Sequence, residues 1–172
     1  MKHIKGFLLF VLTFTILFGI AGCRIYRFKD VNIDPDIKTV KVNYIINKAR
    51  YQNPQLSPQL SDKLRQKINN QTRLTQVQGD DANLEISGVI TSYDPTLTSG
   101  ISNQQAATNR LNISVSITIK NRLDDKKSRE ETVTRNFDYA ATLSLDQAEA
   151  QLNSTIIQNL TDEIFNRIFS NW

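Results

Sequence analysis

Cys23 is the only cysteine in this chain of 172 residues, and it follows directly after the longest apolar run. A thiol can react as a nucleophile or simply fill a small space in a core. Residues 1–5 are basic, and residues 6–22 are uncharged, mostly apolar and end in small residues. This order is typical of a secretory signal peptide, and the apolar run is slightly too short for a membrane-spanning helix. The position of Cys23 therefore favours a processing site over a buried core thiol.

The four residues Ile20-Ala21-Gly22-Cys23 resemble the lipobox of bacterial lipoproteins, in which a branched aliphatic and two small residues precede the cysteine. That resemblance implies cleavage after residue 22, a diacylglyceryl group on the Cys23 sulfur and acylation of the new amine. Several acyl chains on one residue anchor a protein stably, whereas one chain holds it only reversibly. An uncleaved anchor and an ordinary secreted protein are the alternatives. We predict a membrane-anchored protein whose only attached group is the lipid on Cys23, with no other cofactor.

Removal of the signal peptide, residues 1–22, would also remove His3, the only histidine. Without a thiol or an imidazole, Cys–His and Ser–His–Asp catalysis and Cys- or His-based zinc sites are excluded. The carboxylate pairs Asp80-Asp81 and Asp124-Asp125 lie in stretches typical of solvated turns, and the six glycines form no phosphate-binding loop. We therefore predict that the protein is not an enzyme and has no metal site.

The mature chain, residues 23–172, is long enough for one domain with a hydrophobic core. Two of the 21 basic residues (Lys2 and Lys5) and none of the 17 acidic residues lie in the signal peptide, so 19 basic residues face 17 acidic ones. This near balance gives no reason to expect nucleic-acid binding. For a lipoprotein, Arg24 rather than Asp after the cysteine implies the outer membrane, and the lack of an acidic cluster after Cys23 favours its periplasmic side. We predict a tether over residues 23–38 and a single domain over residues 39–172.

Four stretches alternate apolar and polar residues as strands do: 39–47, 83–93, 110–121 and 132–141. In the first, Val40, Val42, Tyr44 and Ile46 are expected to share a face, and Asp94-Pro95 is expected to end the second. The third is the clearest, and its apolar positions are Leu111, Ile113, Val115, Ile117 and Ile119. The last two stretches predict a hairpin whose tip is residues 122–131. A brief additional strand is possible within residues 73–77.

Two stretches show helical periodicity. The first is expected to begin with Ser57 as N-cap and Pro58 at the first helical position, and to end near Gln71. Ser144 to Gln147 fits a capping box for a second helix over residues 145–169. The predicted fold is α+β, with two helices packed on one face of a mostly antiparallel four-stranded sheet, a two-layer sandwich. An amphipathic helix on a membrane surface is the alternative for residues 145–169.

Several ordered segments of the chain resemble the LptE family of lipopolysaccharide-assembly lipoproteins. They are "NNQTRL", "LEISGVITSYDPT", "NRLNISVSITIKN", "FDYAA" and "DEIFNRIFSNW". The resemblance implies an outer-membrane lipoprotein in the lumen of a β-barrel translocon, LptD. Such a protein assists assembly of the barrel, plugs its lumen and helps to insert lipopolysaccharide in the outer leaflet.

Two sets of side chains are candidates for these roles. The polar face of the clearest strand is nearly uncharged and suits a polar barrel interior. Its members are Asn112, Ser114, Ser116 and Thr118. The hairpin tip carries cations that could contact lipid phosphates. They are Arg122, Lys126, Lys127 and Arg129, with Asp124, Asp125, Glu130 and Glu131 as neighbours. An ordinary solvated face and a solvated turn are the alternatives, and a stand-alone periplasmic lipoprotein is the alternative function.

Overall fold

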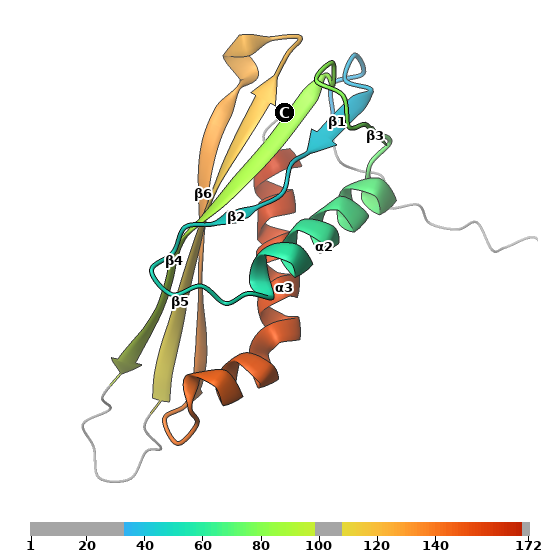
Figure 1. Ribbon diagram of the computed structural model, residues 1–172. Helices are drawn as coiled ribbons and strands as arrows, with labels where there is room; N and C mark the ends of the chain where they lie inside the picture. Colours follow the sequence, from blue (N-terminus) through green and yellow to red (C-terminus); the bar gives the residue numbers. More distant parts are fainter. Residues whose placement is uncertain (1–32, 99–107, 170–172) are drawn as a thin grey trace, which may run out of the picture.

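The computed structural model describes residues 33–98 and 108–169, which form two layers. One layer is a long, twisted sheet, and the other consists of the helices α2 (Leu56–Gln71) and α3 (Leu145–Phe169). Figure 1 shows both helices on the same side of the sheet, so that its other face is left open. The predicted α+β architecture with two helices on one face is therefore confirmed, whereas the predicted number and direction of strands are wrong.

The sheet has six strands and is mixed rather than four-stranded and mostly antiparallel. Three long strands pair antiparallel: β4 (Leu84–Thr98), β5 (Thr108–Asn121) and β6 (Arg129–Ala140). Three short ones pair parallel on the far side of β4: β1 (Thr39–Val42), β2 (Ile46–Asn47) and β3 (Thr75–Gln76). β1 and β2 precede α2, and β3 and β4 follow it. The parallel pairings arise because α2 returns the chain along the sheet, so that the strands after it run in the same direction as those before it.

The core lies between the sheet and the helices and is centred on β5, whose five predicted apolar positions are all fully buried. Gly88 of β4 faces this core. A Cβ at Gly88 would lie 2.9 Å from the Ile117 Cδ1 and 3.1 Å from the Ile45 Cγ1. The missing side chain therefore allows these two isoleucines to pack closely over β4.

The predicted first strand is divided in two because its alternation breaks after Val42. Tyr44 and Ile46 are 49% and 51% exposed, whereas Ile45 is 1% exposed. The Ile45 N–H leaves the sheet ladder and donates to the Ser61 Oγ of α2 (2.9 Å). The expectation that Tyr44 and Ile46 share the buried face of Val40 and Val42 is therefore wrong, because a tertiary hydrogen bond shifts the phase of the strand by one residue.

β4 does not end at Asp94-Pro95, as predicted, but continues to Thr98. β2 pairs with Val89 and Ile90, and no described strand pairs with that edge beyond them. Proline is tolerated there because its missing N–H removes no ladder hydrogen bond. A register shift between Ile90 and Ser92 lets Ile90 and Tyr93 both face the core.

The start of α3 has the predicted capping box. The Gln147 N–H donates to the Ser144 Oγ (3.3 Å), and the Ser144 N–H donates to the Gln147 Oε1 (3.0 Å). Helix α2 begins one residue before the predicted N-cap, at Leu56, so Ser57 lies inside the helix and is buried. Residues 33–38, assigned to the tether, precede β1, and Ile33 and Ile37 within them are buried.

Ile117→Asp is expected to lower the free energy of unfolding by about 4 kcal/mol or more, enough to unfold a marginally stable domain. Ile117 is fully buried, and no cation lies opposite it in the core described above. Ser114→Asp on the open face of the same strand serves as control and is expected to remain folded. Urea denaturation followed by circular dichroism measures both. A cooperatively folded Ile117→Asp variant with wild-type stability would contradict the assignment of the two faces.

Candidate functional site

The open face of the sheet carries a ladder of polar side chains that bond across β5 and β6. The Asn112 Nδ2 donates to the Asn136 Oδ1 (2.6 Å). The hydroxyls of Ser114 and Thr134 are 3.0 Å apart, and the Ser116 Oγ donates to the Glu130 Oε1 (2.6 Å). Three of the four predicted barrel-facing residues thus belong to this ladder, and Thr118 is exposed beside them.

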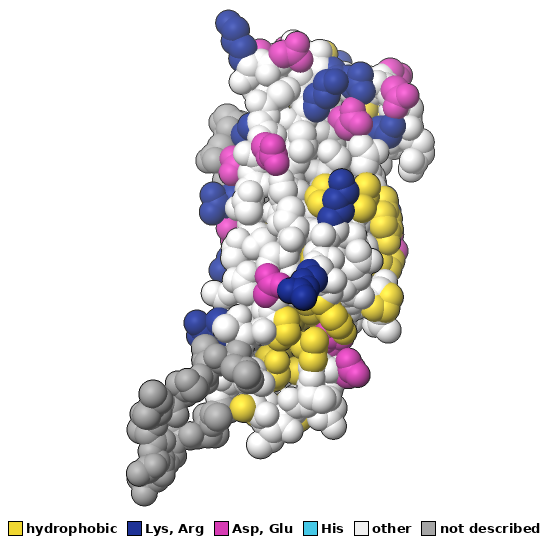
Figure 2. Space-filling model, turned by 60° about the vertical axis from the view of Figure 1, so that its left-hand side comes forward, with side chains coloured by type: hydrophobic (Ala, Val, Ile, Leu, Met, Phe, Trp, Pro, Cys, Tyr) yellow, Lys and Arg dark blue, Asp and Glu magenta, His cyan; other side chains and the backbone are white. Residues whose placement is uncertain are grey.

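Charged groups lie at the ends of this ladder and beside it: Glu130 is the partner of Ser116, and the exposed Asp94 of β4 lies opposite Asn112 in the register. At one end Arg110 forms a bidentate ion pair with Asp138 (2.7 and 3.1 Å), which lowers the pKa of Asp138 and raises that of Arg110. Between the ends, the exposed side chains of β5 and β6 are short and mostly neutral. Figure 2 shows many charged groups at the top of this view and others along its left edge and near its middle, with a white, uncharged polar area between them.

Two consequences follow for binding. Short Ser, Thr and Asn side chains allow another surface to approach the sheet closely. Because the polar atoms of the Asn112 and Ser114 rungs are already bonded to neutral partners, covering these two rungs leaves few unpaired donors or acceptors and needs no compensating charge. The open face is therefore suited to lie against a polar, weakly charged surface.

The hairpin tip contains the short helix η1 (Asp125–Lys127), and two of its candidate cations pair with distant carboxylates. Arg122 pairs with Glu85 of β4 (2.7 Å), and Lys127 pairs with Asp34 before β1 (2.8 Å). The hydrogen bond from Lys127 lowers the pKa of Asp34, and Asp34 in turn raises that of Lys127. These two cations join the tip to the rest of the domain.

Arg129 and Lys126 differ in their surroundings. The Arg129 guanidinium donates to the Ile168 carbonyl (2.8 Å) and the Arg167 carbonyl (3.3 Å) at the end of α3. A cation at this position satisfies carbonyls that have no partner within the helix. Lys126 is exposed, and no carboxylate of the described residues lies within ion-pair distance of it. Among the four candidate cations, Lys126 is therefore the most available to a ligand.

A feature that the sequence analysis did not identify is an aromatic and acidic cluster at the start of α3. The Tyr93 hydroxyl donates to one oxygen of Glu149 (2.7 Å) and the Tyr51 hydroxyl to the other (3.4 Å). The two rings stack with centroids 5.4 Å apart. Burial and the neighbouring Glu149 raise the pKa of both tyrosines. Both hydroxyls therefore stay protonated and act as donors.

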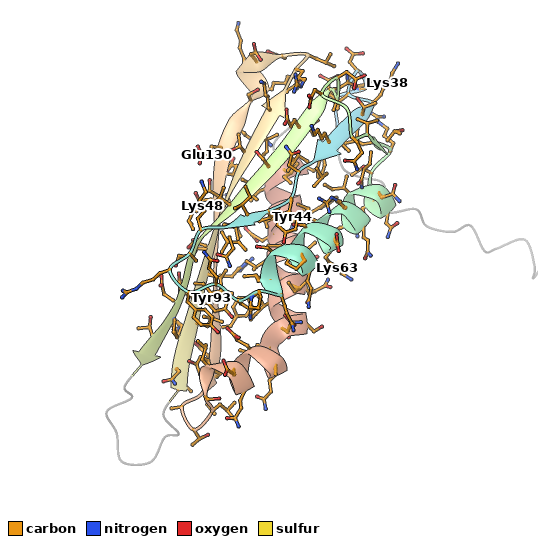
Figure 3. The ribbon with its side chains drawn as sticks, viewed as in Figure 1. Lys38, Tyr44, Lys48, Lys63, Tyr93 and Glu130 are labelled. Atoms are coloured by element: carbon orange, nitrogen blue, oxygen red, sulfur yellow. The ribbon has the colours of Figure 1, made fainter. Side chains whose placement is uncertain are left out.

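Tyr51 lines a hollow of about 310 Å³ together with Asn53 and Pro54 and, from α3, Asp146, Glu149, Ala150 and Asn153. A second hollow of about 280 Å³ shares Asn53 and Pro54 and reaches Tyr44 and Ile46. In Figure 3, Tyr44 lies near β2 and Tyr93 near the segment that leads from β2 to α2. Residues 51–58, "YQNPQLSP", lie in no strand or helix pattern except for the predicted start of the first helix. The aromatic and amide residues of this stretch were the available signal of a surface feature.

Several sequence predictions concern residues that the structure does not describe. Cys23 and the proposed signal peptide lie outside the described ranges. Within residues 33–98 and 108–169, no three metal-ligating side chains cluster in a way that could hold an ion. In the same ranges, neither α2 nor α3 has the length and apolar character of a membrane-spanning helix.

Comparison with known proteins gives a family and a fold. The family model described as "LptE: Lipopolysaccharide-assembly" matches residues 37–168. No curated protein sequence matches the chain. Among solved structures, a minor lipoprotein from Acinetobacter baumannii is 18% identical, with a TM-score of 0.51, over 78% of this chain and 94% of that one. A hypothetical protein from Chlamydia trachomatis is 8% identical, with a TM-score of 0.50, over 78% of this chain and 99% of that one. At these identities the two structures support the fold alone.

Arg129→Met is expected to lower the free energy of unfolding by about 1–2 kcal/mol, because it removes charged hydrogen bonds to the last carbonyls of α3. Lys126→Met removes a cation of the same tip that has no such bonds and is expected to leave stability nearly unchanged. Urea denaturation of the two variants gives the comparison. Equal stabilities would show that Arg129 does not hold α3 against the tip.

Proposed function

Because the chain belongs to the LptE family of lipopolysaccharide-assembly proteins, we propose that it works as the lipoprotein partner of an outer-membrane β-barrel, LptD. In this role it assists assembly of the barrel, occupies part of its lumen and helps lipopolysaccharide to reach the outer leaflet. The role is one of binding and positioning and needs no catalytic residue.

The observation that carries this proposal is the open, self-bonded polar face of β5 and β6. Barrel lumens are polar, so a plug needs a surface that can be covered without burying unpaired charge. The rungs at Asn112 and Ser114 meet this requirement, because each side chain pairs with a neutral side chain of β6, whereas the rung at Ser116 ends in the Glu130 carboxylate.

The proposed lipid on Cys23 supports the same role. The chain is packed into the domain from Ile33, which is 4% exposed. The chain from Cys23 to Ile33 could span at most about 35 Å if fully extended. A membrane anchor of this reach would keep the domain at a high effective concentration near a barrel in the same membrane. We therefore propose an outer-membrane location on the periplasmic side.

Ser114→Asp is expected to weaken the complex with the barrel about tenfold or more, because it places an unpaired charge in the covered face. Asn69→Asp, on the exposed side of α2, adds the same charge away from the interface and is expected to leave the complex intact. The measurement is co-purification of the barrel with each variant from outer membranes in mild detergent. Depletion of the wild-type chain is expected to lower both folded barrel and lipopolysaccharide at the cell surface.

Two outcomes would contradict this proposal. Wild-type protein that is extracted without any barrel would favour a stand-alone periplasmic lipoprotein. A stable complex in which Ser114→Asp binds as well as wild type would place the interface elsewhere on the domain.

For the lipid, we propose that Lys126 at the hairpin tip contacts a phosphate of lipopolysaccharide. Lys126→Glu is expected to weaken binding to phosphorylated lipid A about two- to fivefold, with a larger effect at low salt. Lys63→Glu on α2 is the matched charge reversal. Surface plasmon resonance at two ionic strengths tests both variants. Unchanged binding of Lys126→Glu would leave the tip as a solvated turn.

A further inference from the structure

Two hollows beside β2 are adjacent, because Asn53 and Pro54 line both of them. We call the pair the Asn53–Pro54 groove and define it by residues 44–57 together with residues 146–153 of α3. The hollows have volumes of about 310 and 280 Å³. Each is large enough for a single pyranose ring, and together they suit a short chain of such rings.

The walls of the Asn53–Pro54 groove are unusually apolar for an exposed surface. Tyr44, Ile46 and Tyr51 are 49%, 51% and 36% exposed, and they are three of the four large hydrophobic side chains exposed among the described residues. Figure 2 shows hydrophobic side chains gathered beside the uncharged polar area of the open face. Exposed tyrosines offer flat apolar faces and a hydroxyl at the edge, which suits a ligand that is partly apolar and partly polar.

Two buried polar atoms of the groove residues have no hydrogen-bond partner in the described part of the chain. The Asn47 Oδ1 accepts from the Ala49 N–H (3.0 Å), but the Asn47 Nδ2 is unpartnered. The Ser57 Oγ is also unpartnered, and Ser57 is only 6% exposed. Buried polar atoms are normally satisfied, so a donor and a hydroxyl left open at one hollow indicate that something else supplies their partners.

The charges around the groove restrict what that partner can be. The hollow next to β2 is lined by Tyr, Ile, Asn, Gln, Pro and Ser and carries no charged residue. The other hollow contains Asp146 and Glu149 and no basic residue. A phosphate would be repelled there. A hydroxylated neutral ligand is favoured, because carboxylates and amides accept from hydroxyls and amides also donate to them.

We propose that the Asn53–Pro54 groove binds a neutral saccharide segment of lipopolysaccharide, an assignment that rests on the proposed function for the choice of glycan. The C–H face of a sugar ring packs on Tyr44 or Tyr51. Ring hydroxyls pair with the Asn47 Nδ2 and the Ser57 Oγ and with the carboxylates at the start of α3. The groove thereby separates recognition of the glycan from recognition of phosphate at the hairpin tip.

The test uses the full chain and a dephosphorylated, lipid-free oligosaccharide from the core of lipopolysaccharide. Binding is followed by isothermal titration calorimetry and by chemical-shift changes of the groove residues. Tyr44→Ala and Ser57→Ala are each expected to weaken binding about fivefold to tenfold. Leu123→Ala is the control, since Leu123 is the fourth exposed hydrophobic side chain and lies at the hairpin tip (54% exposed).

Thermal unfolding distinguishes loss of the site from loss of the fold. Ser57→Ala removes an unpartnered buried hydroxyl and is expected to keep or raise the melting temperature while affinity falls. Saccharide affinity that is equal in wild type, Tyr44→Ala and Ser57→Ala, or no saccharide binding at all, would overturn the proposal. Loss of the barrel complex in Tyr44→Ala with saccharide binding unchanged would also overturn it, because the groove would then be a protein contact.

A second probe, a soluble peptidoglycan fragment, distinguishes the source of the glycan. Tighter binding of the lipopolysaccharide oligosaccharide is expected, and equal or tighter binding of the peptidoglycan fragment would overturn the assignment. Saccharide binding by the isolated chain is measured without the barrel, so its result does not depend on the proposed barrel complex. Saccharide binding without a barrel partner would refute the proposed function alone, and a barrel complex without saccharide binding would refute this inference alone.

Discussion

Alternate side chains of β5 from Leu111 to Ile119 are all fully buried on the side of the sheet that the helices cover. Strand geometry then directs every intervening side chain to the opposite side. No described helix covers that side, so its side chains must be polar enough to face water. Because β6 lies alongside, the side chains of β5 can hydrogen-bond to those of β6 rather than to water. The open polar face is therefore set by the same alternation that builds the core. A shift of the strand register by one residue would turn polar side chains into the core and apolar side chains onto the open face.

This dependence explains which elements could be predicted from the sequence. β5 and α3 are long, and each repeats a single period many times without interruption, so local pattern and tertiary environment agree. β1 and β2 are short, and their phase is set by the bond from Ile45 to Ser61, a residue that follows 16 positions later. β2 and β3 contain two residues each, which is too few to show any period. Their parallel pairing depends on the path of α2, which no local pattern records.

The candidate sites show the same division. The polar positions of β5 follow from the alternation and could be predicted. The state of the tip cations could not, because Lys127 meets Asp34 across 93 positions and Arg129 meets the end of α3. The Asn53–Pro54 groove was not predicted either, since its two walls are separated by more of the chain than any motif spans. The sequence offers four tip cations to a ligand, but the contacts of the folded domain leave fewer of them available.

The order of elements along the chain has a consequence for biogenesis. Helix α3 follows all six strands, yet it covers much of the apolar face that they form. Synthesis proceeds from the N-terminus, so the sheet can pair while one wall of its core is still missing. Until residues 145–169 arrive, isoleucines and leucines of β4 and β5 remain open to solvent and to other chains. The chain is then most vulnerable to aggregation before α3 has packed, which would make this folding step the one that benefits most from a chaperone.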